Sequence, residues 1–253
     1  YLGGGVLFAV NVLMVLNPGA FGIADASQAV RVAFVTVGAW WLLFTVPLLL
    51  FVRERRAEAP LPPAQAVRAG FRELAGTFAH VRRDRTLLWF LLAYWFYIDG
   101  VNTIIKMAVD YGLSLGFEQA SLMTALLVTQ FVGFPSALAF GWLGQRIGAR
   151  TGIFVAIAVY AAVSVYAYFL DSEAEFYALA VTIGLVQGGI QSLSRALYGR
   201  LVPEGKAAAI VGPLLTGTVA VVTGDPRLGI VSVVVLFVVG AFFLAKVPAE
   251  PRR

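Results

Sequence analysis

Long apolar runs separated by short polar connections dominate this chain of 253 residues. A helix of about 20 apolar residues crosses the hydrocarbon core of a bilayer, whereas a membrane barrel needs short segments in which apolar and polar residues alternate. We expect eight membrane helices, at about residues 3–16, 32–52, 87–113, 120–143, 152–170, 176–197, 207–222 and 228–247. The sequence therefore predicts an all-α polytopic membrane protein in contact with the lipid bilayer.

The charged residues lie mostly between these runs. The net charge is +5, but its Arg and Lys residues are concentrated in connections, where positive charge indicates the cytoplasmic side of a membrane, so we expect no nucleic-acid partner. The densest basic connection is 53–86. If that connection is cytoplasmic, the alternation of eight helices places the other basic connections on the same side and the acidic ones outside. Both termini of this piece are then expected to be cytoplasmic.

The connection 53–86 also divides the chain. Prolines interrupt its first part, and apolar residues then recur at helical spacing, at Val67, Phe71, Leu74, Phe78 and Val81. This pattern predicts an amphipathic helix on the inner membrane surface. We interpret it as a tether between two bundles, with a regulatory or partner-binding helix as the alternative.

Residue types that carry enzyme chemistry are scarce. Cysteine is absent, and the single histidine, His80, lies outside the expected spans. No HExxH-type spacing and no phosphate-binding loop is present, so an ATP-driven pump is not supported. We therefore expect no catalytic residues, no metal and no cofactor, and a protein that is not an enzyme.

The segment 87–113 carries one charged face. Asp99, Asn102, Lys106 and Asp110 are three, four and four residues apart, which places them within roughly 80° of one another on a helix. An ionisable group in the bilayer costs on the order of 3 kcal/mol, so such groups usually line a cavity, pair with one another or carry ions. The spacing favours a substrate or proton pathway. The alternative is that Lys106 and Asp110 neutralise each other while Asp99 and Asn102 fix helix packing.

Glutamines on other helices are expected at a similar depth. Asp99 lies about 18 Å from the cytoplasmic end of its helix, near the middle of a core roughly 30 Å thick. Gln130 and Gln187 reach nearly the same level from the other side, and Gln191 shares a face with Gln187. Transporter sites lie near the midplane, often beside a broken helix, so we expect these side chains to converge there, with a break at Gly100.

Several segments resemble a known family. The stretch 141–150, GWLGQRIGAR, resembles the major facilitator signature loop Gly-x-Leu-x-Asp-Arg-x-Gly-x-Arg. The matching positions are Gly141, Leu143, Arg146, Gly148 and Arg150, whereas Gln145 stands where the superfamily usually has aspartate. The segments DGVNTIIKMAVDYG, GLVQGGIQSLSRALYGRLVP and GDPRLGI are similar to the branch that contains the vacuolar amino-acid effluxers and their bacterial relatives.

This resemblance implies a domain plan. Residues 1–52 would be the last two helices of an N-terminal half, 53–86 a cytoplasmic linker, and 87–253 a complete C-terminal six-helix bundle. The first four helices would be absent, so the missing N-terminal half would be a partner of this piece. The join at Gly205 and Lys206 is about a dozen residues shorter than the family pattern.

The resemblance also implies a function. It suggests a secondary active transporter of a small polar solute, such as amino acids or related metabolites, that works by alternating access in the cytoplasmic membrane of a prokaryote. Asp99, with Lys106 as a movable counter-ion, makes proton coupling the expected mechanism. The alternative is a non-transporting membrane protein that uses the same fold to bind a partner.

Overall fold

The computed structural model describes residues 2–52, 81–201 and 226–248, together with six isolated positions between 62 and 76. The chain divides into two compact units, residues 1–69 and 70–253, and each is described by itself. All regular elements of the described ranges are helices. The predicted helix at 207–222 and most of the predicted amphipathic helix at 67–81 lie outside these ranges.

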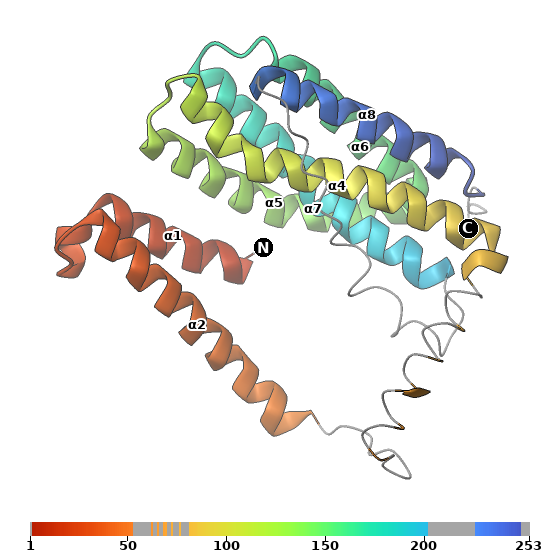
Figure 1. Ribbon diagram of the computed structural model, residues 1–253, viewed down its shortest axis with the longest axis horizontal. Coiled ribbons are helices and arrows are strands. Elements are labelled where there is room, and N and C mark those ends of the chain that lie inside the picture. Colours follow the sequence, from red (N-terminus) through yellow and green to blue (C-terminus); the bar gives the residue numbers. More distant parts are fainter. Residues whose placement is uncertain are drawn as a thin grey trace. The chain divides into compact units, whose positions relative to one another are not determined.

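The first unit is a helical hairpin (Figure 1). It consists of α1 (Leu2–Leu16), the short 3-10 helix η1 (Pro18–Phe21) and α2 (Ala26–Phe51). Asp25 caps α2 by accepting a hydrogen bond from the Gln28 amide at 2.7 Å, and such a cap stabilises a helix by about 1 kcal/mol. Between the helices, the Thr36 hydroxyl donates to the Asn11 side chain at 2.9 Å.

The second unit contains the five remaining helices that the structure describes. They are α4 (Arg85–Ser114), α5 (Gln119–Ile147), α6 (Ala149–Ala167), α7 (Glu173–Leu201) and α8 (Pro226–Ala245). Helices α2, α4, α5, α6 and α7 are long and apolar enough to cross a membrane, and Gly3–Leu16 and Val233–Ala245 are shorter apolar helices. The predicted all-α polytopic membrane fold is confirmed.

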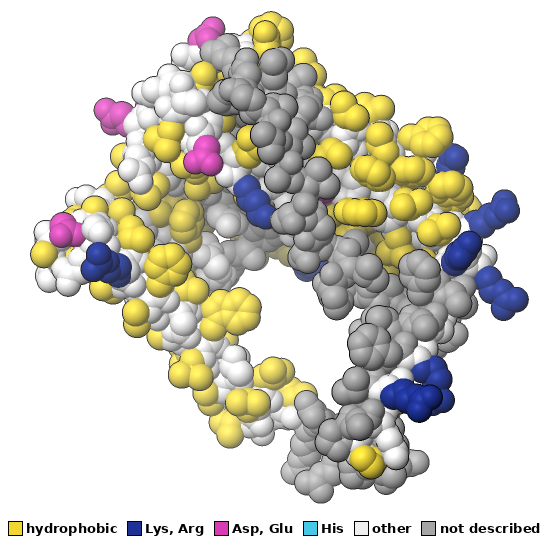
Figure 2. Space-filling model, in the orientation of Figure 1, with side chains coloured by type: hydrophobic (Ala, Val, Ile, Leu, Met, Phe, Trp, Pro, Cys, Tyr) yellow, Lys and Arg dark blue, Asp and Glu magenta, His cyan; other side chains and the backbone are white. Residues whose placement is uncertain are grey.

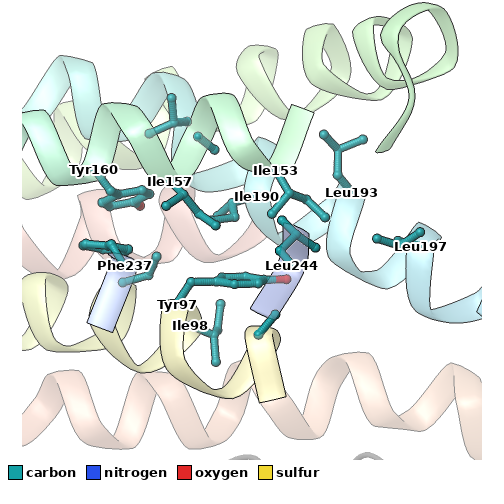
Figure 3. Close-up of a cluster of buried hydrophobic side chains, with 14 of the residues drawn as sticks. Tyr97, Ile98, Ile153, Ile157, Tyr160, Ile190, Leu193, Leu197, Phe237 and Leu244 are labelled. Atoms are coloured by element: carbon teal, nitrogen blue, oxygen red, sulfur yellow. The ribbon is translucent and has the colours of Figure 1, made fainter. Parts of the chain in front are cut away.

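Four helices of the second unit share one core. Helix α4 packs on α8, and α6 packs on both α7 and α8. Side chains from all four converge in Figure 3, where Tyr160 of α6 stacks on Phe237 of α8 with ring centroids 5.5 Å apart. Lipid tails are as apolar as these side chains, so it is close packing that holds the helices together in a bilayer.

Helices α5 and α7 meet along a seam of small residues. A Cβ atom added at Gly188 would lie 2.7 Å from both the Cβ of Ala137 and the carbonyl oxygen of Gly133. The Thr129 hydroxyl donates to the Ala180 carbonyl at 3.1 Å, and the Ser136 hydroxyl donates to the Leu185 carbonyl. Glycine at this seam lets the two backbones approach closely enough for these bonds between helices.

The predicted loop at 141–150 is mostly helical, which corrects the sequence expectation. Helix α5 continues to Ile147 and α6 begins at Ala149, so only Gly148 separates them. Its φ of +85° lies in the region that only glycine adopts at little cost. A single glycine is sufficient because the whole change of direction occurs at this residue.

The two ends of the second unit carry opposite charge. Acidic residues near the starts of α5 and α7 lie at one end, and they are Glu118, Asp171, Glu173 and Glu175, whereas Asp84 lies at the other end, where it caps α4. Basic residues lie at the end where α4 begins and α7 and α8 end, and they are Arg82, Arg83, Arg85, Arg146, Arg150, Arg200 and Lys246. Figure 2 shows this separation, with most of the blue side chains at one end of the bundle. We refer to these as the basic and the acidic ends.

Candidate functional site

The charged face of α4 lies opposite the packed face of the same helix. Tyr97, Val101 and Ile104 are buried in the core shared with α6, α7 and α8. The polar residues Asp99, Asn102, Lys106 and Asp110 point to the other side, where Asp99 is partly buried and the other three are exposed. The described helices of the second unit therefore leave this polar face uncovered.

The charges on this face do not neutralise one another through a direct contact. Lys106 lies seven residues after Asp99 on this face, about 10 Å along the helix. Within the described part of the chain, however, neither Asp99 nor Asp110 has a cationic partner within 4.0 Å. A carboxylate and an ammonium on one helix face, both without a fixed ion pair here, are groups that a polar solute or a proton can use.

The predicted break at Gly100 is wrong, because α4 is a continuous helix from Arg85 to Ser114. Gly100 serves packing instead: a Cβ atom at this position would lie 3.0 Å from the Phe237 ring and 3.2 Å from Val233, both on α8. The absent side chain lets α8 lie against α4. Asp99 and Lys106 therefore remain seven residues, or about 10 Å, apart along an unbroken helix.

The glutamines follow one another along the bundle. The Tyr97 and Ser194 hydroxyls, 2.6 Å apart, set the register of α4 against α7. With a rise of 1.5 Å per residue, this register places Gln191 near the level of Asp99 and Gln187 about one turn closer to the acidic end. The contact of Thr129 with Ala180 places Gln130 more than a turn beyond Gln187. Three levels thus follow one another along the bundle: Asp99 with Gln191, then Gln187, then Gln130. These side chains do not lie at the single level that was expected from the sequence.

Gln187 has an unusual environment among them. Its side chain is 8% exposed, and its Oε1 atom has no hydrogen-bond partner among the described residues. Gln130 and Gln191 are partly buried. A buried amide oxygen without a donor costs about 1–3 kcal/mol, so this position calls for a hydroxyl or an amine that the described part of the chain does not supply.

The signature positions have separate roles. The Arg150 guanidinium donates to the carbonyl oxygens of Leu244 and Ala245, at 3.2 and 2.8 Å, and so caps the end of α8. The Arg146 guanidinium lies 3.9 Å from the centre of the Trp142 ring, and Gln145 is exposed. Gly141 and Leu143 lie within α5, and Gly148 forms the turn.

Tyr97 is a central residue that sequence reasoning missed. It is fully buried, and its hydroxyl is held by Ser194, 97 positions away in the sequence. The one available signal was that Ser194 lies seven residues after Gln187, which places both on one face of α7. A tyrosine in an apolar run gives no comparable indication of its partner.

These features define the class of the protein: a polytopic, all-α integral membrane protein of the major facilitator type. The chain belongs to the family described as "Vacuole effluxer Atg22 like", whose model matches residues 1–253. The predicted membership of the vacuolar effluxer branch is therefore confirmed.

Individual relatives agree with this assignment. The chain is 38% identical over 264 residues to the "Uncharacterized MFS-type transporter YxiO" of Bacillus subtilis. This match covers 99% of this chain and 61% of that protein. It is 26% identical over 289 residues to Autophagy-related protein 22 of Yarrowia lipolytica, with 96% of this chain and 48% of that protein covered. Autophagy-related protein 22-2 of Aspergillus clavatus is 25% identical over 275 residues, with 93% and 44% covered. No solved structure matches the chain. The chain thus spans about half of the length of these relatives.

Proposed function

We propose that this chain forms part of a secondary active transporter that moves a small polar solute across the membrane by alternating access. The observation that carries the proposal is the uncovered face of α4, where Asp99, Asn102 and Lys106 lie opposite the core. Charged groups are expensive in a bilayer and mark the paths of solutes and ions. A relative that is named as an MFS-type transporter supports the same reading.

Amino acids or related metabolites are the proposed class of solute. Such a molecule carries an ammonium and a carboxylate, and the α4 face offers Asp99 and Lys106 as groups of opposite charge. The family description as a vacuole effluxer supports export of small solutes from a compartment.

Proton coupling is proposed to run through Asp99. This carboxylate is partly buried, and no cation of the described residues lies within 4.0 Å of it. Burial favours the protonated form of a carboxylate, whereas an approaching ammonium favours the ionised form. A conformational change that moves Lys106 relative to Asp99 would therefore load or release a proton.

The alternative proposal is a membrane protein with the same fold that does not transport. Its α4 face would bind a polar surface of another membrane protein. Its support is the same uncovered stripe. The two proposals differ in a single measurable property, the net flux of solute. The relative named as an MFS-type transporter gives no support to an enzymatic role.

The test uses full-length protein reconstituted into vesicles with a pH gradient. We expect Asp99→Asn to fold and insert normally but to lose pH-driven uptake, while exchange of solute across the membrane persists. Asp110→Asn is the matched control, because it removes the same charge from an exposed position of the same helix and should retain most of the uptake. Normal pH-driven uptake by Asp99→Asn would overturn the proposed coupling, and the absence of flux from wild-type protein for any tested solute would favour the partner-binding alternative.

A further inference from the structure

Lys246, just beyond the end of α8, is held by two aromatic rings. Its ammonium nitrogen lies 4.3 Å from the centre of the Trp89 ring and 4.6 Å from that of the Phe242 ring. Each such contact contributes about 0.5–1 kcal/mol at an exposed site. Together they fix the position of a long side chain that is otherwise free to move, although the residue itself is exposed.

Among the described residues, the N–H groups of the Lys246 side chain do not bind the carbonyl groups at the end of α8. A lysine at a helix C-terminus usually interacts with the last carbonyl groups. Here Arg150 already binds the carbonyl oxygens of Leu244 and Ala245. No carboxylate of the described ranges lies within 4.0 Å of the Lys246 ammonium. Its N–H groups therefore remain available, among the described residues, for a ligand with acceptor oxygens and negative charge.

An aromatic surface leads from Lys246 along both helices. Trp89 of α4 stacks on Phe243 of α8 at 5.6 Å, and Phe243 stacks on Phe96 at 5.7 Å. Phe242 beside them is 57% exposed. Aromatic side chains at the end of membrane helices are typical of the region where headgroups meet acyl chains. Figure 2 shows an apolar face over α8 that ends at basic side chains.

The charge around this surface is positive. Arg85 lies one turn before Trp89 on the same face of α4, and Arg82 and Arg83 precede it, all exposed. Asp84 is the one acidic residue of this segment, and its carboxylate already accepts hydrogen bonds from the amides of Thr86 and Leu87, at 3.0 and 3.1 Å. Basic pockets between membrane helices on the cytoplasmic side attract anionic headgroups.

We propose that Lys246, Trp89 and Arg85 form a binding site for an anionic phospholipid at the basic end of α4 and α8. The headgroup phosphate would accept hydrogen bonds from Lys246 and Arg85, and the acyl chains would lie along Phe242 and Phe243. This inference rests on the placement of the helices in a membrane and does not depend on the transport proposal.

The experiment is native mass spectrometry of full-length protein, titrated with phosphatidylglycerol or with phosphatidylcholine of the same acyl chains. We expect wild-type protein to bind the anionic lipid more tightly than the zwitterionic one. Lys246→Gln should weaken phosphatidylglycerol binding about fivefold, as the loss of one lysine at a membrane surface predicts. Binding of phosphatidylcholine should change much less, because its choline cation offsets the charge of its phosphate, and this retained binding also shows that the variant is folded.

Two further variants separate the site from the general charge of the basic end. Arg200→Gln removes a cation from the last turn of α7 and should leave the preference for phosphatidylglycerol unchanged. Trp89→Leu keeps every charge but removes the ring beneath Lys246, and should reduce the preference. A preference that survives in Lys246→Gln, or that falls equally in Arg200→Gln, would overturn the proposed site.

Discussion

The hydrogen bond between Tyr97 and Ser194 links α4 to α7 at the scale of single residues. Ser194 donates to the Ile190 carbonyl at 2.5 Å, so the Tyr97 hydroxyl donates to Ser194. We expect Tyr97→Phe to lower the free energy of unfolding by at most about 1 kcal/mol, which is the usual net contribution of a hydrogen bond. Hydrogen bonds between membrane helices contribute less than this on average. Tyr94→Phe removes a hydroxyl from the same helix and should change stability by less than about 0.5 kcal/mol. Unfolding in a detergent titration compares the two variants, and equal effects would contradict the role of this bond.

Single residues differ in how well their surroundings could be predicted. The polar face of α4 was predictable because helical spacing alone brings Asp99, Asn102 and Lys106 together. The role of Tyr97 was not, because it depends on the packing of two helices far apart in the sequence. The unpartnered oxygen of Gln187 likewise follows from packing and not from its place in a pattern.

At the scale of helices, the seam between α5 and α7 depends on glycine. A methyl group at Gly188 would meet Ala137 and the Gly133 carbonyl at 2.7 Å, so α5 would have to move away. We expect Gly188→Ala to cost about 1–3 kcal/mol of stability, the usual cost of overpacking. Gly199→Ala is the matched control on the same helix, because nothing lies within 4 Å of its added Cβ atom.

In that control, alanine should be neutral or stabilising by up to about 1 kcal/mol, since glycine is the poorer helix former. Thermal unfolding of both variants in the same detergent measures the difference. A Gly188→Ala protein as stable as Gly199→Ala would mean that the seam can open at no cost.

The helices themselves were largely predictable, but the meaning of their glycines was not. The run expected at 87–113 is α4 at Arg85–Ser114, because apolar length determines a membrane helix. Gly100 was expected to break that helix, yet it accommodates Phe237. Gly148 was expected within a loop of ten residues, yet it forms the turn alone. A glycine permits both a turn and a close approach, and only the neighbouring helix decides between them.

At the scale of the whole molecule, the separation of charge predicts how the chain lies in the membrane. Basic residues gather at one end of the second unit and acidic residues at the other. Positive charge favours the cytoplasmic side, so we expect the connections before α5 and before α7 to be external. The connection between α1 and α2 should be external as well. Four helices separate Ser27 from Ser172, and an even number of crossings returns the chain to the same side of the membrane.

Cysteines introduced at Ser27, Ser172 and Ala57 test this arrangement, since the chain has no cysteine of its own. In intact cells that express the full-length protein without other accessible thiols, an impermeant maleimide should label Ser27→Cys and Ser172→Cys. Ala57→Cys should react only after the membrane is opened, because it lies in the basic connection. Labelling of Ala57→Cys alone would mean that the whole orientation is inverted. Labelling of Ser27→Cys without Ser172→Cys, or the reverse, would show instead that one of the four helices between them does not cross the membrane, because the two positions share a side in either orientation.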